Sequence, residues 1–298
     1  MANGVRVQAW TFDELYGRDS AFLDGLQARG QVFVGEIPSN FHVWLRKPRV
    51  LRRAAKNARK RGRGRKYPRV AKGPCSCEVR NLATYSPIFR QQTWQRYRIK
   101  DTDKGPDVWE IKWSPCWRKS ADGLPGRRHC LIVARNVRTG EVKYFLANRV
   151  PGEQGTSLRR LLGIAFGRWS IESCFRQSKE ELGLDHFEVR GWRCVHRHYY
   201  LVQLSQLFCA RMRQKYDRPT AERGISLTVE QVRSAVNEWL STVDLKPEAR
   251  QRRYEKELKN QQYHQRRNEQ ARKSHTKTRI AELRNLGIDP DRIKSCLD

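Results

Sequence analysis

The chain has 298 residues and a formal net charge of +30. This excess is far beyond what solubility requires and indicates a polyanionic partner such as nucleic acid, because each neutralised phosphate releases counterions. Nine Trp and ten Phe exclude a merely charged, disordered chain, since so many aromatic residues indicate a packed core. No apolar run approaches a membrane span and no signal peptide is evident, so we expect a cytoplasmic protein without a membrane partner.

The eight cysteines do not form the pattern of a disulfide framework, which agrees with a reducing cytoplasm. Cys75 and Cys77 form a C-x-C sequence, and no second Cys or His pair follows at the spacing of a zinc site. Free thiols are therefore favoured over a structural zinc ion.

The N-terminal region predicts two parallel strands joined by a helix. Residues 5–12 alternate between apolar and polar side chains and predict a strand that ends at Asp13. A cap at positions 19–20 begins a predicted helix over residues 21–29, and a second strand is expected over residues 31–38. A strand, a helix and a strand in so short a span are typical of a βαβ unit.

The segment 46–72 has no acidic residue, and about half of its positions are basic. A solvated loop is one interpretation, and an arm that follows DNA phosphates is the favoured one at this charge density. The residues expected to contact DNA are Arg59, Lys60, Arg61, Arg63 and Arg65.

Strands and then helices are expected in the rest of the chain. The predicted strands are residues 93–99, 108–113, 129–136 and 142–148, the last two joined by a hairpin turn at 138–141. The predicted helices are residues 157–182, 194–215, 228–240 and 247–286, followed by a short helix that starts at Asp289 and Pro290.

Three charges fall within the apolar face of the helix predicted over residues 157–182. At about 100° per residue, Arg168, Glu172 and Lys179 lie in the middle of that face. The apolar residues of the face are Leu158, Leu161, Ala165, Trp169 and Phe175. A buried carboxylate requires a partner. An ion pair between Arg168 and Glu172, with Arg176 as a further partner, and a catalytic role for Glu172 explain the pattern about equally well.

Asp13 supplies a second carboxylate. A carboxylate just past the C-terminal end of a parallel strand lies where α/β sites are built, although a plain cap or turn residue is the alternative. Together, Asp13 and Glu172 suggest a Mg²⁺ or Mn²⁺ site for phosphoryl transfer. Lys179, two helical turns beyond Glu172, is placed to hold a phosphate, and Arg168 to do the same or to orient Glu172.

Two separated blocks resemble the DDE transposases of bacterial insertion sequences. They are FDELYGRDSAFLDGLQARGQVFVGEIPSNF and RWSIESCFRQSKEELGLDHFEVRGWRCVHRHYYL, and the second is similar to the Y-x2-R-x3-E-x6-K signature. The resemblance implies an α/β, RNase H-like fold with a β-rich insertion and a helical C-terminal region. It also implies Mg²⁺- or Mn²⁺-dependent endonuclease and strand-transfer chemistry on double-stranded DNA, at insertion-sequence ends and in target DNA.

The resemblance assigns roles by position. Asp13 matches the second catalytic Asp and Glu172 the catalytic Glu, and both are expected to bind metal. Arg168 and Lys179 match the R and K that contact DNA. Further DNA contacts are predicted at Arg176 and Trp113. A nucleoid-associated protein that acts as a homodimer on DNA follows from the resemblance.

Trp109, Trp113 and Trp117 lie in the segment that matches the β insertion. Each has the ring needed to stack on a base, but a buried strand Trp is the favoured interpretation of each.

The resemblance is incomplete at two positions. Ala165 stands where the signature has Tyr, and no residue matches the family's first Asp. We therefore expect an N-terminally truncated, catalytically incomplete copy that lacks the first strands of the fold. A non-catalytic DNA-binding remnant or repressor of transposition is the alternative, and an RNA-binding protein of the translation machinery is a weaker one.

Five segments are expected along the chain. They are the second part of the RNase H-like core (1–45), the basic arm (46–72), the β-rich insertion (73–152), the helical completion of the core with Glu172 (153–242) and a basic helical tail (243–298).

Overall fold

The computed structural model describes residues 6–51, 67–102, 104–120, 122–216 and 227–296. They form a mixed α/β protein that divides into two compact units. The first unit lies within Met1–Arg168 and Ser274–Asp298, and the second is Trp169–Lys273. Across these described ranges, every helix is too short or too polar to span a lipid bilayer.

The first unit is built on a mixed sheet of eight strands. Its strands are β1 (Val34–Glu36), β2 (His42–Trp44), β5 (Cys77–Glu78), β6 (Gln95–Thr102), β7 (Gly105–Lys119), β8 (Pro125–Asn136), β9 (Val142–Ala147) and β10 (Lys294–Ser295). The order is β1-β9-β8-β7-β2-β5, with β6 beside β7 and β10 beside β6. Only the β10–β6 pairing is parallel among these strands. A separate pair, β3 (Val50–Leu51) and β4 (Arg69–Val70), is antiparallel.

The four strands predicted from the sequence correspond to β6, β7, β8 and β9, and the predicted hairpin is confirmed. Asn136 holds its turn, because the side-chain Oδ1 accepts the N–H groups of Arg138 and Thr139, each at 3.0 Å. Gly140 has a φ of 72°, which a residue with a side chain adopts at a cost. The local turn chemistry therefore fixes the register of the hairpin.

The N-terminal segment differs in part from its prediction. The helix predicted over residues 21–29 is confirmed as α2 (Ser20–Ala28), after a short α1 (Glu14–Gly17). Within residues 6–12, however, the predicted strand is reduced to a single parallel bridge between Trp10 and Phe33. Alternation of apolar and polar residues predicts which side chains point to each face of a strand. It does not predict how many residues form backbone hydrogen bonds with a neighbouring strand.

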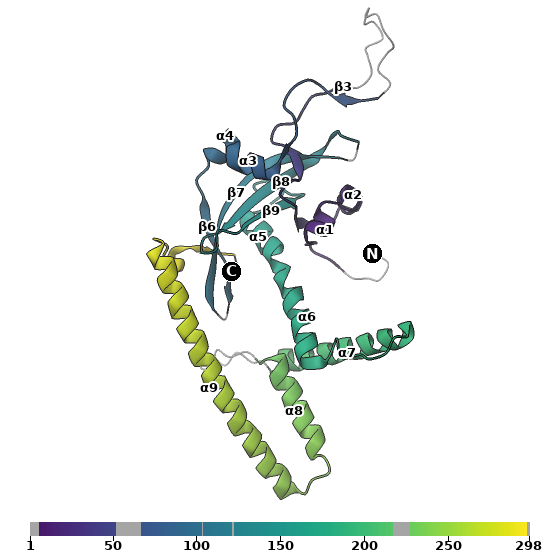
Figure 1. Ribbon diagram of the computed structural model, residues 1–298, viewed down its shortest axis with the longest axis vertical. Coiled ribbons are helices and arrows are strands. Elements are labelled where there is room, and N and C mark those ends of the chain that lie inside the picture. The colour runs from purple at the N-terminus through teal and green to yellow at the C-terminus, as the bar shows by residue number, and fades with distance from the viewer. Residues whose placement is uncertain (1–5, 52–66, 103, 121, 217–226, 297–298) are drawn as a thin grey trace, which may run out of the picture. The chain divides into compact units, whose positions relative to one another are not determined.

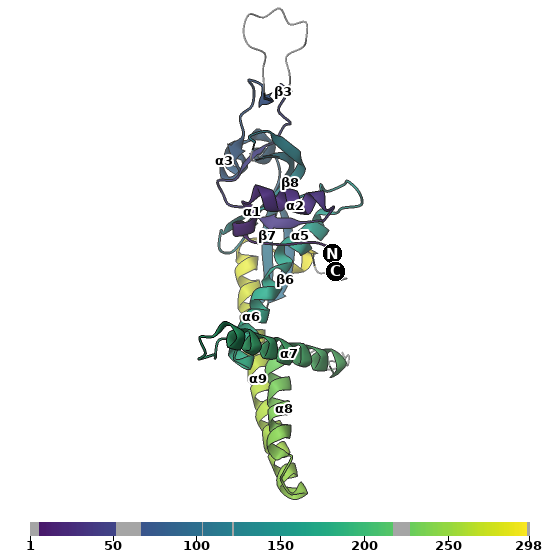
Figure 2. The same ribbon diagram turned by 90° about the vertical axis from the view of Figure 1, so that its right-hand side faces the viewer.

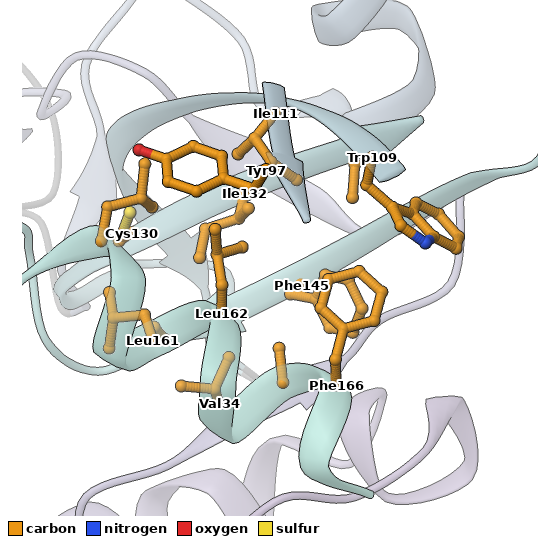
Figure 3. Close-up of a cluster of buried hydrophobic side chains, with 14 of the residues drawn as sticks. Val34, Tyr97, Trp109, Ile111, Cys130, Ile132, Phe145, Leu161, Leu162 and Phe166 are labelled. Carbon is orange, nitrogen blue, oxygen red and sulfur yellow. The ribbon is translucent and has the colours of Figure 1, made fainter. Parts of the chain in front are cut away.

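Helices cover both faces of the sheet (Figure 1). On one face, α5 (Leu158–Gly167) buries Leu161, Leu162 and Phe166 against strand residues. Figure 3 shows Phe166 beside Phe145 and Trp109, with ring centroids 5.3 and 5.0 Å away. The opposite face packs against α2, α3 (Val79–Tyr85) and α4 (Pro87–Arg90).

Segments predicted to be separate share the same sheet. β1, from residues 1–45, pairs with β9, and β2 pairs with β7 from residues 73–152. The predicted boundary between core and insertion is therefore not a boundary between sheets, and the five-segment division remains a prediction.

The C-terminal part of the first unit packs at the β6–β7 turn. Leu283 and Ile288 are buried in contact with Val108. The Nη1 group of Arg279 donates to Thr102 Oγ1 at 3.1 Å. The predicted terminal helix is confirmed as the 3-10 turn η1 (Pro290–Arg292), capped by Asp289.

The second unit is helical, and its predicted helices are confirmed with small changes of boundary. It contains α6 (Trp169–Leu182), α7 (Trp192–Tyr216), α8 (Val229–Thr242) and the first part of α9 (Pro247–Asn285). Cys209 of α7 packs with Val229 and Val232 of α8. Thr228 and Gln231 form a capping box at the start of α8. Figure 2 shows α8 and α9 joined by a short turn.

The helix predicted over residues 157–182 is divided at Arg168 into α5 and α6, and this corrects the sequence interpretation. The buried face ends at Phe166, whereas Trp169 and Phe175 are 48% and 55% exposed. Glu172 and Lys179 are exposed and Arg168 is half-buried. A continuous apolar face was expected because periodicity does not show that the two halves belong to different compact units. Glu172 therefore does not carry the burial penalty that the prediction assumed.

We predict that Phe166→Ala lowers the free energy of unfolding by about 3–5 kcal/mol, because the truncation leaves a cavity between α5 and the sheet. Phe175→Ala, a control at the exposed position, should change it by no more than about 0.5 kcal/mol. Urea unfolding followed by circular dichroism measures both. Equal losses would show that the apolar face continues into α6.

His129 makes the stability of the first unit depend on pH. Burial, with a smaller contribution from the nearby Arg118 charge, lowers the pKa of its imidazole from 6.5 to about 4. Between these values the unfolded chain binds the proton and the folded chain does not, so stability falls as the pH falls. We predict a loss of about 3 kcal/mol between pH 6.5 and pH 4 from this residue. His129→Phe should flatten the pH dependence of the urea midpoint, and an unchanged slope would contradict the assignment.

Candidate functional site

Asp13 lies at the end of a short parallel ladder. Val34 N–H donates to Trp10 O and Glu36 N–H to Phe12 O, both at 2.9 Å, and Trp10 N–H donates to Val32 O at 2.8 Å. Asp13 follows directly and is half-buried. The predicted location, just past the C-terminal end of a segment parallel to its neighbour, is what the structure shows.

Two glycines allow this segment to approach β1 closely. A Cβ on Gly35 would lie 1.8 Å from the Phe12 ring, and a Cβ on Gly17 would lie 1.9 Å from the carbonyl oxygen of Glu36. No side chain fits at either distance. Both ends of the segment that carries Asp13 are therefore fixed by backbone packing.

The Asp13 carboxylate has a structural role of its own. It is the N-cap of α1, where Oδ1 accepts N–H groups from Leu15 at 3.1 Å and Tyr16 at 3.5 Å. Both bonds end on the same oxygen, Oδ1. A carboxylate that is oriented by a cap while one oxygen points elsewhere fits the requirements of a metal ligand.

An open groove lies beside Asp13. It is lined by Glu14 of α1, by Arg18 just after that helix, by Asn40 before β2 and by His42 of β2. Its volume is about 540 Å³. Both an acidic residue, Glu14, and a basic one, Arg18, line the groove, so it can accept a polar ligand next to the Asp13 segment.

Glu172, Arg176 and Lys179 share one exposed face of α6. The inner face is fixed by Ser178, which is buried and hydrogen-bonded to Gln206 of α7. At about 100° per residue, the three charged residues lie about 100–160° around the helix from Ser178. The face therefore offers one carboxylate and two cations to solvent, an arrangement suited to a phosphate with a bound metal ion.

Two further contacts anchor the C-terminal end of α6. Glu181 accepts from Arg233 of α8 at 3.0 Å, and Leu182 packs with Val232. Helix α6 is therefore held through Ser178, Glu181 and Leu182.

The two carboxylates belong to different units, Asp13 to the first and Glu172 to the second, and the structure defines each within its own unit. Arg168 ends α5 and belongs to the first unit. Among the described residues, no group of three or more His, Cys, Asp or Glu side chains is arranged to hold a metal ion.

The predicted DNA contacts in the sheet and arm are only partly visible. Trp113 is half-buried and packs against the core under α5, as a strand Trp would. Trp109 is buried in the same core and donates to Asp107 Oδ2 at 3.0 Å. Arg59, Lys60, Arg61, Arg63 and Arg65 lie outside the described residues.

Other polar residues have structural partners. His198 Nε2 lies 2.8 Å from Gly183 O, and His196 Nδ1 lies 3.0 Å from Trp192 O. All eight cysteines are free, including the exposed Cys75 and Cys77.

Sequence reasoning missed two polar clusters. Arg118 of β7 is buried and pairs with Asp24 of α2. Glu110 of β7 accepts from Arg96 and Arg135, at 3.3 and 2.6 Å. Arg118 and its partner Asp24 are separated by 94 positions, and no local signal in the sequence links them. The pairing of β7 with β6 and β8 places Glu110 opposite Arg96 and Arg135, and the sequence did not define this register.

Residues 1–106 match the family model of the DDE superfamily endonucleases. No curated protein matches the chain. The match includes Asp13 and does not extend to Glu172. It supports a likeness of this part of the chain to DDE-type nucleases and transposases.

The two roles of Asp13 can be separated by substitution. Asp13→Ala removes the cap of α1 and is predicted to lower the free energy of unfolding by about 1 kcal/mol. Asp13→Asn keeps an oxygen acceptor for Leu15 and Tyr16 and should leave stability nearly unchanged. Thermal unfolding of the two variants checks this, and equal destabilisation would show that the negative charge, rather than the cap, stabilises the segment.

Proposed function

We propose that this protein is a DNA-binding DDE transposase of the insertion-sequence type, with its first unit derived from an RNase H-like fold that carries a β-rich insertion. One observation carries the proposal. Asp13 follows a parallel ladder, is oriented by a cap and lies inside the region that matches the DDE endonucleases. This is the position that an acidic residue of an α/β active site takes.

Asp13 and Glu172 are proposed as the metal ligands. Their carboxylates are hard oxygen donors, which Mg²⁺ and Mn²⁺ prefer. When bound, such ions activate an attacking oxygen and stabilise a leaving one at phosphorus. The chain's own contribution is orientation, since the cap fixes Asp13 and the contacts of Ser178 and Glu181 fix α6.

DNA is the proposed partner. Arg176 and Lys179 flank Glu172 on the exposed face of α6, and Arg168 immediately precedes that helix. Their charges would hold phosphates next to the metal. The formal charge of +30 makes this binding strong and dependent on salt. Binding to insertion-sequence ends and target DNA, as a homodimer in the nucleoid, is part of the proposal.

Catalysis by this chain alone is not expected. The DDE chemistry proposed uses three carboxylates, and two residues of this sequence match that set. Within the described ranges, no third acidic side chain forms a metal-binding group with either of them. Metal binding should consequently be weak and the attacking oxygen poorly placed.

A non-catalytic DNA-binding protein that represses transposition is the second candidate. The exposure of Glu172 favours it, because a carboxylate on an open helix face with two cations can act in DNA binding alone. Under this alternative, divalent metal ions and Asp13 have no part in DNA binding.

The response of DNA binding to metal separates the two candidates. We predict that Ca²⁺, which supports binding without cleavage, strengthens duplex DNA binding by the wild-type protein at fixed ionic strength. Glu172→Gln should abolish this increase, whereas Glu180→Gln, an exposed control on the same helix, should retain it. Fluorescence anisotropy measures the affinities. If Ca²⁺ changes nothing in any of the three proteins, the repressor alternative is favoured.

A cleavage assay tests the expected lack of catalysis. The purified protein with Mg²⁺ or Mn²⁺ should leave supercoiled plasmid intact, because two residues of the proposed set of three carboxylates, Asp13 and Glu172, have been assigned. Nicking that disappears in Glu172→Gln would contradict this expectation while supporting the metal site itself.

A further inference from the structure

A buried guanidinium in the first unit lacks partners for two of its nitrogen atoms. Arg118 of β7 is 1% exposed. Its Nη2 group donates to the Asp24 carboxylate of α2. In the part of the chain that the structure describes, Nε and Nη1 have no hydrogen-bond partner. Leaving charged N–H groups buried and unpaired costs stability, so the arrangement indicates a ligand that the protein itself does not supply.

Irregular strand pairing accompanies this side chain. The register of β7 on β8 shifts between Trp117 and Lys119, so Arg118 lies at a β-bulge. Bulges redirect side chains and occur next to binding sites. On the other side, Arg118 is paired with Val43 of β2.

His129 of β8 is a second buried group without a full set of partners. Its Nδ1 lies 2.7 Å from the carbonyl oxygen of Arg127, and no described residue contacts Nε2 within hydrogen-bond distance. With Nδ1–H donating to that carbonyl, Nε2 is an acceptor. Two donor positions of Arg118 and one acceptor of His129 therefore remain open in the same region under α2.

An open groove lies beside Arg118. Asp24 and Gly126 both line it, and a Cβ on Gly126 would lie 3.4 Å from Cγ of Arg118. The backbone of Gly126 therefore covers the Arg118 side chain, and Asp24 covers its guanidinium. The groove has a volume of about 660 Å³, ample for a phosphate group.

The groove is strongly basic. Lys47, Arg127 and Arg128 line it, together with the ring of Trp117. Arg128 lies 5.9 Å from that ring and pairs with Glu153. Asp24 is the acidic residue of the lining, and its side chain is 59% exposed, so it is free to swing into solvent.

We propose that this groove is a phosphate-binding site in which an incoming phosphate displaces the Asp24 carboxylate from Arg118 and is held by Arg118, Lys47 and Arg127. Free phosphate, the terminal phosphate of a DNA strand and a phosphodiester share this chemistry. The site goes beyond the proposed function, since neither Asp13 nor Glu172 lines it. Planar N–H groups of arginine suit phosphate oxygens, and exchange of one anion for another leaves the buried charge neutralised.

Asp24→Asn is the most direct test, because it removes the competing anion. The substitution also takes away the carboxylate that pairs with the buried Arg118, so circular dichroism first establishes that the variant is folded. Calorimetric titration with inorganic phosphate should show about tenfold tighter binding than in the wild type. Glu141→Gln, which removes one exposed negative charge at the β8–β9 turn, is the matched control and should change the affinity much less. Equal effects of the two substitutions would overturn the proposal.

Loss of the groove cations gives the opposite result. Arg127→Gln and Lys47→Gln should each weaken phosphate binding several-fold. Arg138→Gln, an exposed control at the β8–β9 turn, should not. Arg118→Met should abolish it if the variant folds. An absence of phosphate binding by both the wild type and Asp24→Asn contradicts the site.

Short single-stranded oligonucleotides with and without a 5′-phosphate distinguish the sources of the ligand. Tighter binding of the phosphorylated strand, lost in Arg127→Gln, assigns a terminal phosphate, and equal binding that is lost in Arg127→Gln assigns a phosphodiester. Oligonucleotide binding that is unaffected in Arg127→Gln overturns the site for DNA. The Ca²⁺ response of duplex binding, measured on the same variants, shows separately whether the proposed function holds.

Discussion

The contact between Phe12 and Gly35 is the constraint on which the candidate site depends. The Phe12 ring occupies the space in which any side chain at position 35 would lie. This contact brings the N-terminal segment against β1 in parallel register. The carbonyl oxygen of Phe12 accepts a hydrogen bond from the N–H group of Glu36, and Asp13 follows at the end of the ladder. The sheet behind β1 is otherwise antiparallel up to β6. One close backbone approach therefore creates the local α/β geometry in which an acidic residue becomes useful.

The division of the predicted helix at Arg168 leaves the second carboxylate, Glu172, exposed. It separates a helix that buries its apolar face, α5, from one that exposes most of its own, α6. Glu172 and Lys179 consequently lie on an exposed face of α6, where solvent screens their charges. The same chain thus keeps one carboxylate oriented by a cap and another oriented by the anchoring of its helix.

Local features of the fold were predictable from the sequence, and long-range ones were not. The caps at Asp19 and Thr228 and the turn at Gly140 depend on a few neighbouring residues, so their signals are complete in the sequence. The placement of Asp13 was predictable for a similar reason, because strand and turn are adjacent. The exposure of Glu172 was not, since periodicity cannot distinguish one helix from two that belong to different units. The burial of Arg118 beneath Asp24 depends on a bulge and on pairing across 94 positions, for which no sequence pattern exists.

The central claim is that Asp13 is a metal ligand and not only a helix cap, and Mn²⁺ binding measured by electron paramagnetic resonance tests it most directly. Asp19 offers a matched control, because it also caps a helix through one carboxylate oxygen and is not a proposed ligand. The account predicts that Asp13→Asn weakens Mn²⁺ binding by the folded protein while Asp19→Asn leaves it unchanged. Equal Mn²⁺ affinity in wild type and Asp13→Asn would contradict the claim and leave Asp13 as a cap alone.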